Sequence, residues 1–473
     1  MTYEITEQDK SFWPRLRAFV RESLSDNETD FTIGPIGRAL GLLAIPMMLE
    51  MAMEAVFAVV DIAFVSRLGT NAIAAVGLTE ALVTVLYAVA IGLGMGVTAM
   101  VSRRVGAKDR DAAAHVTGQA IWVGGALAVV IGITGVTYAA DLLHMMGASA
   151  EVVDTGKGFT AILLGGSASI LYLFLLNAAF RGAGDAPVAL RSLTLANGIN
   201  ILLDPCLIFG LGPFPELGVT GAAVATTIGR GVGVMYLVYY LFGSKGRLQF
   251  QPRHLKIATA VITRMISISV GGVGQFLIAT SSWIVIMRIV ALYGSGPIAA
   301  YTIALRLIEF AFLPAWGLGN ATATLVGQNL GAGKPERAER TVWRASKYNA
   351  IFMTVIGVLM LLLASQIVSL FSAEPEVMRY GTSCIRILGV GYPMYAVGMI
   401  IIQAINGAGD TRTPSFMNFI CFWMMQIPLA YWLATAAGLG PDGVFLSIVI
   451  AESVLTILGV LVFRRGNWRE QQV

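Results

Sequence analysis

The stretch LGTNAIAAVGLTEAL at residues 68–82 returns 225 residues later as YGSGPIAAYTIALRL at residues 293–307. The identical positions at this shift are Gly69, Ile73, Ala74, Ala75 and Leu82, which align with Gly294, Ile298, Ala299, Ala300 and Leu307. The same shift aligns GLG at 92–94 with GLG at 317–319, and GAGD at 182–185 with GAGD at 407–410. Several ungapped matches at one shift indicate an internal duplication rather than a chance recurrence of glycine.

The composition requires a bilayer as solvent for much of the chain. Of 473 residues, 56% are hydrophobic and 13% are charged, which is about half the charged share of an ordinary soluble domain. A membrane-spanning helix needs about 20 apolar residues. Such stretches lie near 40–65, 78–101, 118–140, 159–180, 189–211, 221–242, 265–292, 299–326, 348–371, 384–405, 416–437 and 443–463. The sequence therefore predicts an all-α membrane protein of about twelve transmembrane helices.

The duplication divides these helices into two pseudo-symmetric lobes of six. Because six is an even number, both halves enter the membrane from the same side and form parallel repeats about an axis along the membrane normal. The expected divisions are an N-terminal segment (1–38), an N-lobe (39–242), a linker (243–262), a C-lobe (263–465) and a tail (466–473).

Positive charge in the loops predicts the orientation. Lys and Arg gather after the second span, in the central linker and after the eighth span, at Arg103, Arg104, Lys108, Arg110, Lys245, Arg247, Arg253, Lys256, Lys334, Arg337, Arg340, Arg344 and Lys347. Cytoplasmic loops carry such an excess. We therefore expect a multi-pass protein of the cell's inner (plasma) membrane with both termini in the cytoplasm. The net charge of +4 reports on this orientation and does not indicate a nucleic-acid partner.

The first residues are mixed and polar, so no cleavable signal peptide is expected. Within them Phe12, Leu16, Phe19 and Val20 recur at helical spacing with Lys10, Arg15, Arg17 and Arg21 nearby. This pattern fits either a short helix on the membrane surface or a disordered tail.

Motifs for enzymatic chemistry are absent from the sequence. There is no GxxxxGK[ST] loop, no nucleophile elbow and no zinc-binding helix motif. The three histidines are scattered, and the three cysteines sit in separate apolar stretches. We expect neither an enzyme nor a cofactor.

Ionisable residues at membrane depth are costly unless they are partnered or hydrated, so they mark candidate sites. Glu50, Glu54 and Asp61 share one stripe of the first span, while Asn197, Asn200 and Asp204 share one face of the fifth. A carboxylate with amide oxygens one turn away is a reasonable site for Na⁺ or for a proton, because burial favours the protonated form. The alternative for Asp61 and Asp204 is a structural polar bond between helices.

Other charged residues at this depth have simpler interpretations. Arg306 and Glu309 are three residues apart and are predicted to form a local ion pair. Glu80, Arg230, Arg288 and Glu452 are expected to pair between helices, with partners that the sequence does not identify. Pro46 removes a backbone hydrogen bond inside the first span and permits a hinge there.

Taken together, the chain resembles the multidrug and toxic compound extrusion (MATE) transporters over nearly its full length. The resemblance is carried by VVDIAFVSRLGTNAIAAVGL (59–78), RGAGDAP (181–187), LGVTGAAVATTIGR (217–230), GLGNATATLVGQNLGAGKPERA (317–338) and NGAGDTRTP (406–414). It implies a MATE/MOP-type fold in which two six-helix lobes enclose a central cavity that opens alternately to each side.

Within that family the chain is most similar to the DinF-like branch, which carries its cation site in the N-lobe. The resemblance assigns this site to Asp61, Asn177, Asn200, Asp204 and Thr226. For the threonine the register of the match is less fixed, and Thr227 or Thr220 could take its place. The resemblance also assigns the hinge to Pro46. One interpretation of the site is that Asp61, Asn200 and Asp204 bind Na⁺. Glu50 and Glu54 lie outside the family pattern and are expected to be auxiliary. The seventh and tenth spans lack a carboxylate, so the C-lobe acidic site of other branches is not expected.

These inferences predict a monomeric, secondary active multidrug exporter that exchanges cations for drug, with H⁺ favoured over Na⁺ as the coupling ion. Its substrates would be small, amphipathic and cationic organic compounds. Its other partner would be the surrounding membrane lipid. A flippase for lipid or lipid-linked oligosaccharide is the alternative, although only Arg230, Arg288 and Arg306 offer positive charge at depth. A receptor or scaffold that transports nothing is a third class.

Overall fold

The computed structural model describes residues 12–25, 29–243, 246–471 and 473, and among them it contains helices and turns but no strands. Eleven helices are long and apolar enough to cross a membrane, and a bent pair makes a twelfth span. The prediction of about twelve spans is thereby confirmed. The first six are α2 (Ile36–Val65), α3 (Thr70–Gly106), α4 (Arg110–Thr137), the pair α6 (Ala150–Gly165) with α7 (Ser167–Ala183), α8 (Ala186–Phe209) and α9 (Val219–Phe242), with a short α5 (Ala139–Met145) before the pair.

The second six repeat this arrangement. They are α10 (Thr259–Val290), α11 (Ser295–Gly331), α12 (Pro335–Ser369), α13 (Pro375–Gly407), the eleventh span made of α14 (Arg412–Asn418), η4 (Phe419–Gln426) and α15 (Ile427–Thr435), and α16 (Pro441–Arg465). The η4 segment is π-helical. It ends just before Pro428, which cannot donate a hydrogen bond to the preceding turn and so favours a wider one.

The bend in the fourth span lies where another helix packs closely against it. α6 and α7 meet at Gly166 at an angle of 40°. A Cβ at Gly166 would lie 2.6 Å from Cγ2 of Thr227 on α9. Only glycine therefore allows α9 to approach the break this closely.

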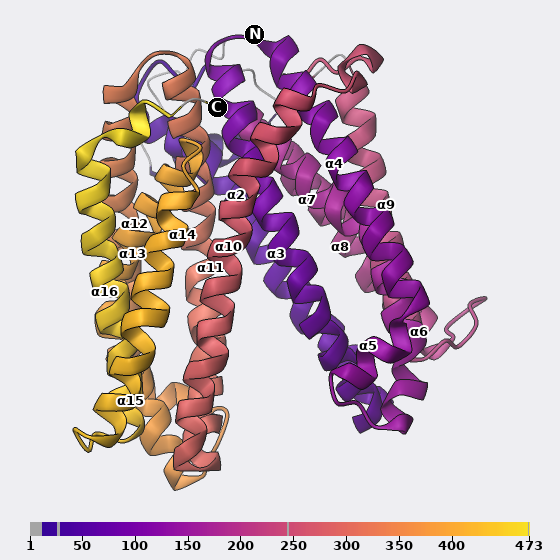
Figure 1. The fold of residues 1–473 in the computed structure, drawn as a ribbon, viewed down its shortest axis with the longest axis vertical. Coiled ribbons are helices and arrows are strands. Elements are labelled where there is room, and N and C mark those ends of the chain that lie inside the picture. The colour runs from indigo at the N-terminus through magenta and orange to yellow at the C-terminus, as the bar shows by residue number, and fades with distance from the viewer. Residues whose placement is uncertain (1–11, 26–28, 244–245, 472) are drawn as a thin grey trace.

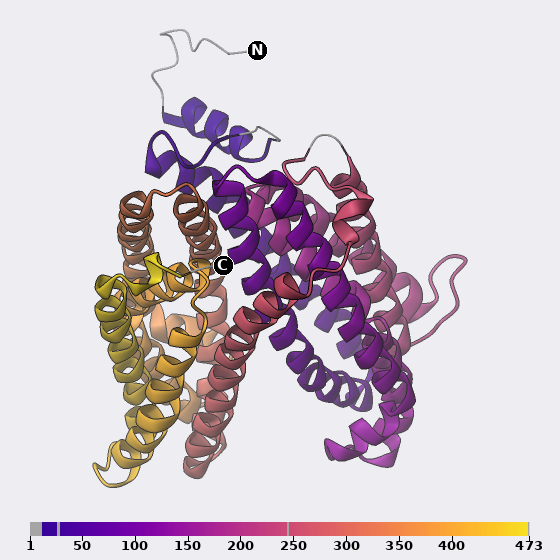
Figure 2. The same cartoon turned by 45° about the horizontal axis from the view of Figure 1, so that its top comes forward.

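The two sets of six helices form a V. In Figure 1 the C-lobe (α10 to α16) and most of the N-lobe (α3 to α9) lie close together at the end that holds the C-terminus and spread apart toward the other end. The turned view in Figure 2 shows the same separation. We call the end where the lobes meet the closed end and the other the open end.

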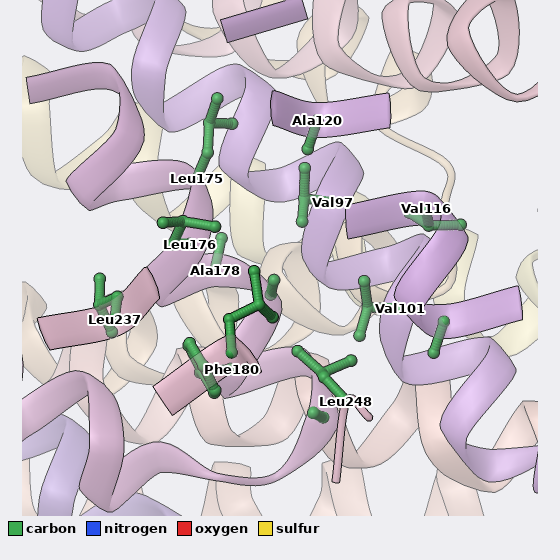
Figure 3. Packing of buried hydrophobic residues seen from close by; sticks show 14 of the residues in the cluster. Val97, Val101, Val116, Ala120, Leu175, Leu176, Ala178, Phe180, Leu237 and Leu248 are labelled. Carbon is green, nitrogen blue, oxygen red and sulfur yellow. The ribbon is translucent and has the colours of Figure 1, made fainter. Parts of the chain in front are cut away.

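Buried apolar side chains hold each lobe together. Figure 3 shows part of the N-lobe core, to which Val97 and Val101 of α3, Phe180 of α7 and Leu237 of α9 contribute side chains. All four side chains are almost completely buried. Leu248 from the linker fills the edge of this core, so the linker is packed against the N-lobe.

Glycines bring the two lobes into backbone contact. A Cβ at Gly92 of α3 would lie 2.5 Å from the amide nitrogen of Val273 on α10, and one at Gly317 of α11 would lie 2.8 Å from the Cα of Met48 on α2. Gly317 stands 225 residues after Gly92, and Val273 stands 225 after Met48. The two contacts are therefore pseudo-symmetric copies of one contact, which confirms that the duplication is present in space.

Polar contacts from the chain ends cover the closed end. Residues 29–35, which we call the N-terminal strap, lie against α12, where Arg337 donates hydrogen bonds to the carbonyls of Phe31, Ile33 and Gly34 over 2.9–3.2 Å. From the tail, the carbonyl of Gln471 accepts a hydrogen bond from Arg103 of α3. Both segments thus bridge elements that are far apart in the sequence.

The amphipathic pattern near the N-terminus forms the helix α1 (Phe12–Ser23). Phe19 packs against Gly41 of α2, and Arg38 forms an ion pair with Glu22 over 2.6 Å. Trp13 is 70% exposed and Leu16 39% exposed. Lys10 lies outside the described residues. The placement of this helix on a membrane surface stays a prediction.

Candidate functional site

Close packing of α8 against α9 builds the centre of the candidate site. A Cβ at Gly229 of α9 would lie 2.5 Å from the carbonyl of Ala196 on α8, and Gly233 meets Ala196 one turn further along. Small residues at such spacing let two membrane helices approach closely. This approach lets the Asn200 side chain donate a hydrogen bond of 3.0 Å to the Thr226 hydroxyl.

Asp204 lies one turn along α8 from Asn200, which donates a long hydrogen bond of 3.5 Å to its Oδ1. Asp204 is 0% exposed, and both Asn200 and Thr226 are buried. Thr227, by contrast, bonds the carbonyl of Ala223 in its own helix. The structure thus puts Thr226, and not its neighbour, beside Asn200.

Oxygen atoms in this cluster outnumber the donors that reach them. Oδ2 of Asp204 and Oδ1 of Asn200 are buried with no hydrogen-bond partner in the described part of the chain. The same holds for Oδ1 of Asp61 on α2, whose carboxyl group is close enough to Asp204 to interact with it electrostatically. Buried polar atoms without partners are rare in proteins and call for an explanation. We name Asp61, Asn200, Asp204 and Thr226 the N-lobe polar cluster.

The helix that carries Asp61 belongs to both lobes. At the closed end, Leu40, Leu43 and Met47 of α2 pack in one apolar cluster with residues of α11 and α13. At its far end, Val65 packs into the core of the N-lobe. Pro46 is buried and lies on the closed-end half. α2 therefore connects the lobe interface with the N-lobe polar cluster.

Asn177 occupies a different position from the one expected. Its Oδ1 accepts a hydrogen bond of 2.8 Å from Ser192, and its side chain lines the central cavity. No hydrogen bond joins it to Asn200, Asp204 or Thr226 among the described residues. Asn197, also on α8, instead donates to the carbonyl of Met53 on α2 over 3.4 Å.

Glu50 and Glu54 each lie near an arginine. Glu50 forms an ion pair with Arg181 over 2.5 Å, and both side chains are largely buried. Glu54 is close enough to Arg230 to interact electrostatically, and Arg230 donates a hydrogen bond of 2.6 Å to the Tyr87 hydroxyl. Arg181 was given no role from the sequence, because the fourth span was predicted to end at residue 180. α7 in fact continues to Ala183.

A central cavity of about 320 Å³ lies between the lobes. The N-lobe contributes Glu50, Glu54, Asn177 and Arg181, and the C-lobe contributes Trp316, Asn320, Gln403 and Asn406. This volume falls within the range of about 300–1,000 Å³ typical of small-molecule sites. Arg181 is the one basic residue in the lining, and Glu50 neutralises it.

The remaining charged residues at depth have mixed outcomes. Arg306 and Glu309 form the predicted ion pair over 3.4 Å. Arg230 pairs between helices as expected, and Glu80 is close enough to Arg306 of α11 to interact electrostatically. Arg288 and Glu452 form no salt bridge with any described residue, so the expectation of pairing is wrong for them.

No group of three or more His, Cys, Asp or Glu side chains in the described ranges is arranged to hold a metal ion. Na⁺ at the N-lobe polar cluster would therefore depend on the amide of Asn200 and the hydroxyl of Thr226 in addition to the two carboxylates.

The fold and the duplicated frame agree with a known family. The MatE family model matches the chain twice, at residues 46–206 and 273–432, once in each lobe. The chain belongs to the MatE family. Its members are transporters, so this MatE protein is a multi-pass membrane transporter, and the expected resemblance is confirmed.

Relatives and solved structures support this assignment over nearly the whole chain. The probable multidrug resistance protein NorM of Thermotoga maritima is 27% identical over 445 residues, which cover 93% of this chain and 94% of the relative. A protein of Shewanella oneidensis named FAD transporter is 27% identical over 84% of this chain and 88% of its own. An outward-facing multidrug resistance MATE family transporter of the MOP superfamily superposes with a TM-score of 0.86 at 27% identity, covering 93% of this chain and 98% of that one.

Proposed function

We propose that this MatE protein exports small, amphipathic, cationic organic compounds across the plasma membrane as a monomer, by exchange for an inward-moving cation. The observation that carries the proposal is the set of unpaired, buried oxygens on Asp61, Asn200 and Asp204. Such a set is incomplete without a positive charge or an added donor. The multidrug names of relatives such as NorM supply the substrate class.

We favour H⁺ over Na⁺ as the coupling ion. A proton needs only one carboxyl oxygen, and it turns an acceptor into a donor for one of the unpaired oxygens. The proximity of Asp61 to Asp204 favours the same event, because two neighbouring carboxylates repel when both are ionised. Na⁺ would have to gather several of these oxygens around one point.

Movement of α2 would couple the cation to the drug. Protonation of the N-lobe polar cluster draws Asp61 toward α8, and α2 bends at Pro46, where the proline removes a backbone hydrogen bond. The bend narrows the N-lobe side of the central cavity and releases drug toward the open end. A cation produces this shift only if it binds the bent state more tightly than the straight one.

With both termini in the cytoplasm, as loop charge predicts, the open end faces outward. The similarity to an outward-facing transporter supports this orientation of the V.

The decisive experiment is Asp204→Asn in proteoliposomes. We expect the variant to fold and insert, and to lose efflux of a fluorescent cationic dye driven by an imposed gradient. Full transport by the variant contradicts the site. A pH gradient imposed without Na⁺, compared with a Na⁺ gradient at uniform pH, identifies the coupling ion: efflux only in the second condition rejects H⁺.

The flippase alternative has less support. A flippase for phosphate-bearing lipids needs several free positive charges in its cavity, whereas the one arginine in the central lining is paired with Glu50. Arg306 is likewise paired with Glu309. Measuring flipping of a fluorescent lipid beside dye efflux separates the two activities, and a receptor or scaffold would give neither.

A further inference from the structure

A second cavity, of about 400 Å³, lies mainly within the C-lobe. Its walls come from α10, α11, α13, α14, η4 and α16, with a smaller contribution from α3. It shares five lining residues with the central cavity: Ile91, Met95, Leu313, Trp316 and Gln403. The two cavities therefore adjoin at these side chains. None of the N-lobe polar cluster lines this second cavity, which we call the C-lobe pocket.

The charge-bearing residue types in the lining of the C-lobe pocket are all acidic. Its lining contains two carboxylates, Glu309 and Glu452, and neither Lys nor Arg. Glu309 is already paired with Arg306 over 3.4 Å. Glu452, on α16, forms no salt bridge with any described residue. A carboxylate at membrane depth without a cationic partner is costly and is a functional candidate by default.

Aromatic rings surround this carboxylate. Phe312 stacks on Tyr395 with ring centroids 4.2 Å apart and planes inclined by 4°. Tyr395 is close enough to Glu452 to interact with it electrostatically. Trp283 and Phe422 complete the wall. Faces of aromatic rings attract cations, and the attraction is strongest where water is excluded.

One polar atom at the same pocket also lacks a partner. Asn418 is 8% exposed and lines the pocket, and its Oδ1 accepts no hydrogen bond from any described residue. An acceptor oxygen, a lone carboxylate and a ring of π-faces all favour positive charge or a hydrogen-bond donor. Nothing in the lining offers a charge that would attract an anion.

We propose that the C-lobe pocket binds a hydrophobic organic cation, with Glu452 as its counter-ion and Phe312, Tyr395 and Trp283 as its aromatic walls. The inference rests on the proposed export of organic cations and adds a binding site that is separate from the N-lobe polar cluster. Drug and coupling ion would then occupy opposite lobes, so that the ion acts on the drug through α2 and not by direct displacement.

Two ions of the same shape and opposite charge test this proposal. Tetraphenylphosphonium and tetraphenylborate are titrated by calorimetry into the full chain in neutral lipid nanodiscs, with no gradient and with empty nanodiscs subtracted. We expect the cation to bind more tightly than the anion. Glu452→Gln should lower the affinity for the cation by about tenfold or more, since it removes one desolvated charge interaction. It should not lower the affinity for the anion.

Glu309→Gln is the matched control, because it removes a carboxylate of the same pocket that is already paired; its cation affinity should stay near that of the unmodified chain. Equal affinity of Glu452→Gln and the unmodified chain for the cation overturns the proposal, as does equal loss for both ions. If Glu452→Gln does not fold, Tyr395→Leu serves instead, because it removes one aromatic wall of the pocket. An affinity for the cation equal to that of the unmodified chain then overturns the proposal.

Two different measurements keep this inference separate from the proposed function. Failure of the coupling proposal appears as transport retained by Asp204→Asn, whereas failure of the pocket proposal appears as cation binding retained by Glu452→Gln.

Discussion

Gly106 and Gly331 each pack against the main-chain carbonyl three residues before the other, Gly106 against Gln328 and Gly331 against Arg103. The two glycines are 225 residues apart, and so are the two carbonyl residues. One contact is thus made twice, as in a symmetric dimer where the same patch faces itself. The closed end is sealed by backbone against backbone, without room for a Cβ on either side.

This close backbone contact predicts that a single methyl group added at Gly331 will destabilise the closed end. Gly331→Ala forces α3 and α11 apart, and overpacking of this kind typically costs about 1–3 kcal/mol. We expect a lower melting temperature and greater labelling, by an impermeant maleimide, of a cysteine placed at the buried Ser102. Gly231→Ala is the control, because nothing lies within 4 Å of a Cβ at that position. Equal labelling in both variants would show that the seal does not depend on this contact.

The buried pair of Glu50 and Arg181 predicts an asymmetric mutational response. Arg181→Met leaves Glu50 as an uncompensated charge in a site where it is 3% exposed, which should destabilise the protein by about 3–5 kcal/mol. The double variant Glu50→Gln with Arg181→Met removes the stranded charge and should recover most of that loss. Chemical unfolding in detergent measures both. A double variant as unstable as the single one argues against the ion pair.

Neighbouring threonines on α9 provide a paired test of the N-lobe polar cluster. Thr226→Val removes the acceptor of the 3.0 Å hydrogen bond from Asn200, and a hydrogen bond of this kind contributes about 1 kcal/mol. We expect dye efflux to fall by about fivefold for that free energy. Thr227→Val removes only a hydroxyl that bonds its own helix, and it should transport normally. Reduced efflux by Thr227→Val together with normal efflux by Thr226→Val would indicate that the functional threonine lies on the other face of α9.

The N-terminal strap predicts a response to acid. Partial burial opposes ionisation of Asp30, but hydrogen bonds from Thr32 and the charges of Lys108 and Lys334 outweigh it and lower the pKa of Asp30. A lowered pKa means that the stabilisation is present above the unfolded value of 3.8 and is lost as the pH falls through the folded one. Proteolysis within residues 29–35 should therefore increase below about pH 4. Asp30→Asn should show that susceptibility at neutral pH; protection equal to the unmodified chain at both pH values would exclude this role.

Hydropathy and the repeat were enough to predict the fold, because both depend on patterns along the chain. The twelve spans and the two lobes follow from apolar length and from the shift of 225 residues. The 40° bend at Gly166 did not follow, and the side chain that packs against it, Thr227, belongs to a helix distant in the sequence. The spacing of residues along one helix does not determine how closely another helix packs against it.

The same limit explains the outcome at the candidate site. Asn200, Asp204 and Thr226 lie together because glycines of α9 admit α8, and two of them could be placed by their spacing on one helix. Asn177 matched the family pattern but bonds Ser192. Arg181 was missed because the fourth span was predicted to end at residue 180, whereas α7 continues to Ala183. Glu452 was expected to have a partner, and only the packing of α16 could reveal that no described residue forms a salt bridge with it.

Leu40, Leu43 and Met47 of α2 are buried against the C-lobe in this state. In the proposed export cycle, opening of the closed end would hydrate part of this apolar surface, and exposing apolar surface to water raises the heat capacity. The equilibrium between the state described here and the state that is open toward the termini should therefore depend on temperature. Cooling weakens the hydrophobic contribution to closure, so the state that is open toward the termini gains population in the cold.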